Sequence, residues 1–85
     1  MGGALTASNC DWTAVESFKS LGDYERLLGS INEQVTLGQA EERRVKKPYS
    51  GLETLDERWY CCRATGETWR LVAPDPPFPG IFDKV

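Results

Sequence analysis

The sequence predicts a small α+β protein in which N-terminal helices pack on a small antiparallel sheet. Three features indicate this fold class. The stretch 58–73 has two runs rich in aromatic, branched and Cys residues around Gly66, as in a β-hairpin. Apolar residues recur at helical spacing within 11–31, and a proline-rich tail occupies 74–80. Residues 1–85 are too few for more than a single domain, so one shallow core is expected.

The hairpin is expected to turn through a three-residue loop, 64–66, with Gly66 in a left-handed conformation. A register with this loop separates the strand residues into two faces. The face predicted to be apolar and to form the core contains Trp59, Cys61, Trp69 and Leu71. The face predicted to be mostly polar contains Tyr60, Cys62, Thr68 and Arg70.

Two helices are expected before the hairpin. Three-residue spacing of Trp12, Val15 and Phe18 predicts a short helix over 11–19. A second helix is expected to begin at a cap formed by Ser20 or Asp23 and to stop near Gly29. The residues on its apolar face are Tyr24, Leu27, Leu28 and Ile31.

The region between the helices and the hairpin allows more than one interpretation. Residues 31–37 alternate between apolar and polar, which predicts a strand, although Ile31 also fits the preceding helix. Residues 39–47 place acids before bases, which favours a helix, and a charged loop fits nearly as well. Ser50 and Glu53 are expected to cap one or two further helical turns.

Charge and composition argue against several classes of function. Ten basic and 13 acidic residues give a net charge of −3, which opposes nucleic-acid binding. The chain contains no histidine, the commonest general base and metal ligand, and no glycine-rich phosphate loop. We therefore expect a protein that is not an enzyme, with no catalytic, cofactor-binding or metal-binding residues. No membrane association is expected, because no apolar run approaches the length of a span.

The cysteines are interpreted as reduced thiols of a cytoplasmic protein. The chain has three, Cys10, Cys61 and Cys62, and the adjacent pair should point to opposite faces of a strand. Cys61 is expected to be a small core residue rather than a reactive thiol. Residues 1–8 are small and polar and are expected to be flexible.

Acidic residues surround the predicted hairpin, and two aromatic residues lie among them. Protein interfaces commonly combine aromatic anchors with a charged rim. A plain solvated surface is the alternative for each single acid. The residues predicted to bind a partner are Glu53, Asp56, Glu57, Tyr60, Glu67, Asp75 and Phe78.

The C-terminal part of the chain resembles immunity protein 27, a family of bacterial polymorphic-toxin immunity proteins. The pattern that matches is Trp59-Tyr60-x-Cys62-x-x-Thr65-Gly66-x-x-Trp69-x-Leu71, followed by Pro74, Pro77 and Gly80. The resemblance implies a small cytoplasmic protein that binds a cognate toxin and blocks its active site or another essential surface. An acidic inhibitor would suit a basic toxin domain, because opposite charges accelerate association. The alternative is a small adaptor or subunit of a constitutive protein complex.

Overall fold

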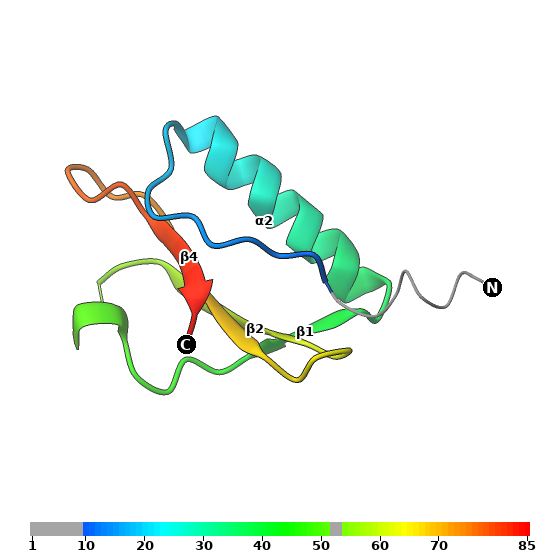
Figure 1. Cartoon of the computed structure of the whole chain (residues 1–85). Helices are drawn as coiled ribbons and strands as arrows, with labels where there is room; N and C mark the ends of the chain where they lie inside the picture. The colour runs from blue at the N-terminus through cyan, green and yellow to red at the C-terminus, as the bar shows by residue number, and fades with distance from the viewer. Residues whose placement is uncertain (1–9, 52–53) are drawn as a thin grey trace.

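The chain folds as an α-helix packed on a four-stranded antiparallel sheet (Figure 1). This computed structural model describes residues 10–51 and 54–85, so residues 1–8 and Glu53 lie outside the described part. The elements are α2 (Leu21–Thr36), β1 (Ala40–Arg43), the 3-10 helix η1 (Tyr49–Gly51), β2 (Glu57–Cys62), β3 (Thr68–Val72) and β4 (Ile81–Lys84). The strands lie in the order β1-β2-β3-β4, each antiparallel to its neighbour. The α+β class is confirmed.

Helix α2 begins as the sequence indicates but runs further. The Ser20 side chain caps it by accepting a hydrogen bond from the Asp23 amide (3.1 Å). The helix continues through Gly29 to Thr36, so the predicted stop is wrong, and of the two interpretations left open after Ile31 the helix is the one that forms. An exposed glycine costs a helix only about 1 kcal/mol. Burial of Ile31, which is 0% exposed, offsets that cost.

Residues 10–18 form an extended segment, named here the N-terminal strap, where a helix over 11–19 was predicted. The backbones of Val15 and Phe82 exchange two hydrogen bonds, of 2.7 and 2.9 Å, which ties the strap to β4. An extended segment also alternates its side chains, so Trp12 can reach the core without a helix. The three-residue apolar spacing in this region therefore does not reflect a helical turn.

A disulfide joins the N-terminal strap to β2 and corrects the expectation of three reduced thiols. Cys10 and Cys62 are bonded, and the thiol of Cys61 is free and buried. The bonded residues are 52 positions apart in the sequence, so only the fold brings them together. The Gln34 amide of α2 donates to the Cys10 carbonyl (3.0 Å), which fixes the strap beside the helix.

The charged stretch 39–47 is not the helix that the order of its charges favours, and only its second half is the charged loop given as the alternative. Ala40–Arg43 is strand β1, which pairs with β2, and irregular backbone follows. Ala40 is 2% exposed, whereas the side chains of Glu42 and Arg43 are in solvent. The pairing of β1 with β2 and the burial of Ala40 therefore favour a strand here, although the order of acidic and basic residues favours a helix.

The hairpin exists, but its register differs by one residue from the prediction. The Cys62 amide donates to the Glu67 carbonyl, so the loop contains the four residues 63–66. Gly66 has a φ of +76°, the left-handed conformation expected of it. Tyr60 therefore lies opposite Trp69, and a shift of one residue exchanges the faces of one strand relative to the other.

The two faces of the sheet are named here the helix side, which packs against α2, and the far side (Figure 1). All four residues predicted for the core are buried, but Trp69 and Leu71 lie on the helix side while Trp59 and Cys61 lie on the far side. The buried residues of the helix-side core are Phe18, Tyr24, Ile31, Tyr60, Trp69, Leu71 and Phe82. Two residues of the face that was predicted to be polar, Tyr60 and Cys62, are therefore buried, at 0% and 2% exposed.

The proline-rich segment connects two strands and is not a tail. Asp75 and Phe78 exchange two backbone hydrogen bonds of 2.9 Å, so the chain reverses between them and enters β4. Gly80 has a φ of +83° and packs tightly against the backbone of β3. Strand β4 was not predicted, and its Phe82 packs into the helix-side core.

Candidate partner-binding surface

The structure distributes the residues predicted to bind a partner over several places. Glu57 and Phe78 belong to the far side, and Asp75 is exposed in the turn that precedes Phe78. Asp56 is exposed, and its carboxylate lies 3.9 Å from Arg58. The predicted residues therefore do not form one continuous acidic face.

Tyr60 lies in the helix-side core and cannot contact a partner in this conformation. Its side chain is 0% exposed, and its hydroxyl has no hydrogen-bond partner among the described residues. Burial raises the pKa of this hydroxyl, and the negative charge of Glu42 raises it further. Its assignment to the exposed face followed from the incorrect register.

Glu67 lies at the opposite end of the sheet from Asp75, beside the hairpin loop. Its carboxylate pairs with Lys84 (2.9 Å) and accepts a hydrogen bond from the Trp69 indole (3.4 Å). These two contacts lower the pKa of Glu67. A hollow of about 570 Å³ separates this pair from the N-terminal strap, with Trp12 among its lining residues.

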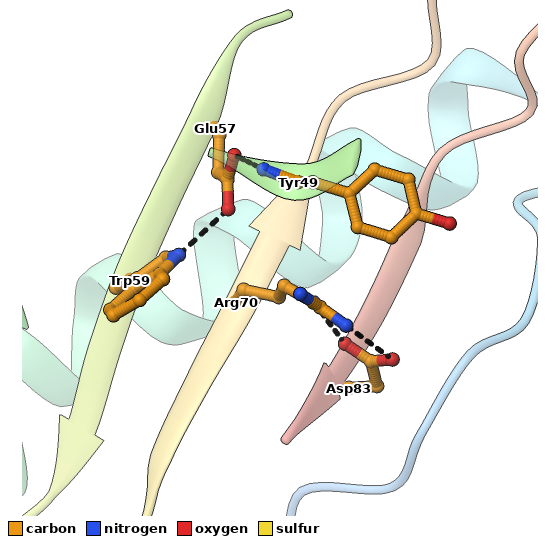
Figure 2. A network of polar contacts seen from close by, with 5 residues as sticks. All are labelled: Tyr49, Glu57, Trp59, Arg70 and Asp83. Carbon is orange, nitrogen blue, oxygen red and sulfur yellow. Dashed lines mark hydrogen bonds and ion pairs between the residues drawn. The ribbon is translucent and has the colours of Figure 1, made fainter. Parts of the chain in front are cut away.

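Five side chains on the far side form a connected arrangement, named here the far-side network (Figure 2). Its members are Tyr49, Glu57, Trp59, Arg70 and Asp83. One Glu57 oxygen accepts from the Tyr49 amide (2.8 Å), and the other accepts from the Trp59 indole (2.7 Å). One carboxylate oxygen thereby ties η1 to β2, and the other holds the Trp59 indole within β2.

Arg70 occupies the centre of the far-side network. Its guanidinium donates to both carboxylate oxygens of Asp83, at 2.7 and 3.4 Å, and lies 4.8 Å from the centre of the Tyr49 ring. The hydrogen bonds to Asp83 raise the pKa of Arg70. The Asp83 carboxylate and the Tyr49 ring together hold the otherwise flexible Arg70 side chain in one position.

The Tyr49 ring of the far-side network packs against a second aromatic ring, that of Phe78, which comes from a different segment of the chain. Tyr49 of η1 and Phe78 of the β3–β4 connection have ring centres 5.7 Å apart, and both are half-buried. Exposed Asp75 lies beside them in the turn. The result is a pair of fixed aromatic side chains with partial solvent access, next to a charged rim.

Of the five members of the far-side network, only Glu57 was among the residues predicted to bind a partner. Trp59 was predicted to be core, Arg70 was placed on the predicted polar face, and Tyr49 and Asp83 had no predicted role. The bidentate pair depends on β4, where Asp83 lies directly opposite Arg70. Ile81 and Phe82 after Gly80 form an apolar run too short to have revealed that strand.

Within residues 10–51 and 54–85, no group of three or more His, Cys, Asp or Glu is placed to hold a metal ion. The described part of the chain also contains no helix with the length and apolar character needed to cross a bilayer. Comparison with protein-family models, with curated proteins and with solved structures gives no match to this chain.

Proposed function

We propose that this chain is a non-catalytic immunity-type protein that neutralises a toxin domain by binding it directly. The observation that carries the proposal is the Tyr49–Phe78 pair, which is half-buried, held above Arg70 and bordered by exposed Asp75. Aromatic and Arg residues fixed in this way are the side chains that dominate the binding energy of protein interfaces. Rigid anchors also lose less conformational entropy when a partner binds.

A basic toxin domain is the proposed partner. Asp75 supplies an unburied carboxylate at the rim of the aromatic pair, and the whole chain carries a net charge of −3. Complementary charge accelerates association and weakens with added salt. The resemblance of 58–80 to immunity protein 27 supports the same class of partner.

The disulfide bears on where in the cell the protein acts. A cytoplasmic location follows from three reduced thiols, and two of the three cysteines are bonded in the fold. Disulfides are rare in reducing compartments, so this bond favours an oxidising one. Rapid alkylation of intact cells, followed by mass analysis of Cys10 and Cys62, decides between the two locations.

An affinity pull-down from the native cells, eluted across a salt gradient, tests the binding role. We expect one toxin-like protein, released at high salt, and we expect co-expression of this chain to restore growth of cells that produce it. The variant Phe78→Ala should lose both effects, whereas Glu67→Gln, at the other end of the sheet, should keep them. Capture of a housekeeping complex without rescue of growth would instead favour a constitutive adaptor.

A further inference from the structure

A second feature of the far side is a groove of about 480 Å³ that adjoins the far-side network at Trp59. We name it the basic groove. Its lining residues are Arg43, Arg44, Lys46, Trp59, Thr68 and Val85. They come from all four strands or from residues directly after them, so the groove crosses the sheet. Its volume lies within the range of sites that enclose a ligand.

The basic groove concentrates positive charge in a protein whose net charge is −3. Arg43 forms an ion pair with Glu41 (2.9 Å). Arg44 and Lys46 are exposed, and neither forms an ion pair with any residue that the structure describes. Most other cations are paired, as Arg70 is with Asp83. Two uncompensated cations at one cavity create a local attraction for negative charge.

The apolar base of the groove is fixed independently of any ligand. The Trp59 indole N–H is already bonded to Glu57 (2.7 Å), so the ring offers only its apolar surface. Thr68 adds a half-buried hydroxyl on the adjacent strand. An apolar base below two cations suits a chain segment in which carboxylate side chains alternate with small side chains that carry methyl groups.

The surroundings of the groove favour a short acidic protein segment over a nucleic acid. Glu41 and Glu42 lie on the neighbouring strand β1 and would repel a long polyanion that extends past the groove. Strand β1 is also the last strand of the sheet. Within the described ranges no backbone hydrogen bond reaches its outer side, so an extended segment could pair there.

We propose that the basic groove binds a short extended segment of a partner protein that carries carboxylate side chains. Arg44 and Lys46 pair with the carboxylates, while Trp59 contacts the intervening apolar atoms. This site is separate from the Tyr49–Phe78 pair, and its test requires no toxin. A negative result for the basic groove would therefore not contradict the proposed toxin binding. A negative result for toxin binding would likewise not contradict the proposal for the groove.

The test measures binding of a fluorescein-labelled peptide of about ten residues, in which Glu alternates with Thr, by anisotropy at low and at physiological salt. The double variant Arg44→Gln with Lys46→Gln should weaken binding about tenfold or more. The matched control removes the same charge elsewhere, by Lys19→Gln with Arg26→Gln, and should change the affinity less than about twofold. Circular dichroism checks that both double variants keep the native fold.

Three outcomes would overturn the proposal. Equal weakening in the two double variants would show that only net charge matters. Equal binding of a peptide with Gln in place of Glu would exclude recognition of carboxylates. Equal or tighter binding of single-stranded DNA of similar length would assign the groove to nucleic-acid phosphates. Amide shifts confined to Arg43, Trp59 and Thr68 in an NMR titration would locate the peptide in the groove.

Discussion

The two sides of the sheet are covered in different ways. On the helix side, a 16-residue helix and the N-terminal strap enclose Tyr60, Leu71 and Phe82, each 0% exposed. On the far side, Trp59 is 7% exposed at the base of the basic groove, and Tyr49 is half-buried. The helix side is held by apolar contacts, whereas the far side combines burial with hydrogen-bonded charges.

This difference suggests that stability and recognition are divided between the two sides. Apolar burial stabilises a small domain most when it is complete. Partly exposed aromatic residues and paired charges add less to stability, but they remain accessible to a partner. The predictions below test this division, beginning with the largest expected effect.

The strongest test compares two tryptophans that are equally buried on opposite sides. Trp69→Ala should cost about 3–5 kcal/mol, because the ring packs 4.9 Å from Phe82 and 5.8 Å from Trp12, centre to centre. Trp59→Ala should cost less, because Trp59 borders the basic groove and its surroundings are less closely packed. Urea denaturation of both variants measures the difference. Equal losses would contradict the proposed division.

Loss of the disulfide should have the next largest effect. The double variant Cys10→Ser with Cys62→Ser should lower the free energy of unfolding by about 2–4 kcal/mol, because the bond closes a long loop in the unfolded chain. Reduction of the wild-type protein should have the same effect. Cys61→Ala is the control and should remain sensitive to reductant. A wild-type melting temperature that does not respond to reductant would refute the bond in solution.

Two glycines should respond to the same substitution with opposite signs. A Cβ at Gly80 would lie 2.8 Å from the Val72 carbonyl oxygen and 2.9 Å from the Pro74 nitrogen, at a φ of +83°. Gly80→Ala should therefore cost about 2 kcal/mol or more. Gly29→Ala, in open space on α2, should stabilise by about 0.5–1 kcal/mol. Thermal melts of both variants check the signs, and a tolerated Gly80→Ala would argue against this connection into β4.

The ion pair of the far-side network should contribute modestly to stability. The Arg70 and Asp83 side chains are 25% and 40% exposed, so solvent screens their attraction. A double-mutant cycle with Arg70→Ala and Asp83→Ala should give a coupling of about 1 kcal/mol or less. A coupling as large as the loss in Trp69→Ala would show that the far side also holds the fold together.

The smallest expected effect concerns acid stability at the hairpin end. The folded state lowers the pKa of Glu67, so its contribution is present above the unfolded pKa and is lost as the pH falls through the folded pKa. Wild type should therefore lose stability relative to Glu67→Gln below about pH 4.3. Melting temperatures of the two proteins between neutral and acidic pH measure this difference. Parallel curves would show that the contacts with Lys84 and Trp69 do not favour the charged form.

Local signals in the sequence predicted part of this fold correctly. The Ser20 cap, the left-handed Gly66 and the existence of the hairpin each depend on residues close in sequence. The end of α2 could not be predicted in this way, because Ile31 fits both a helix and a strand until its burial in the core decides. The loop at 63–66 is one residue longer than expected. This difference changes which residues of β2 and β3 share a face, so Tyr60 lies in the core with Trp69 and not on the exposed face.

Long-range contacts account for the remaining errors. The Cys10–Cys62 bond and the Val15–Phe82 pairing join positions that no local pattern connects. Of the predicted site residues, Glu57 and Phe78 both lie on the far side, where each contacts Tyr49. Arg70 and Asp83, which were not predicted, are brought together only by the pairing of β3 with β4. A site whose residues are brought together by strand pairing cannot be predicted from the sequence until the strands and their order are known.

The most direct test of the division between the two sides measures one variant in two ways. Phe78→Ala removes an aromatic ring of the far side without touching the helix-side core. Denaturation should show a loss of about 1 kcal/mol, while capture of the partner from native cells should disappear. Capture at the wild-type level, or a loss of stability as large as that of Trp69→Ala, would contradict the account.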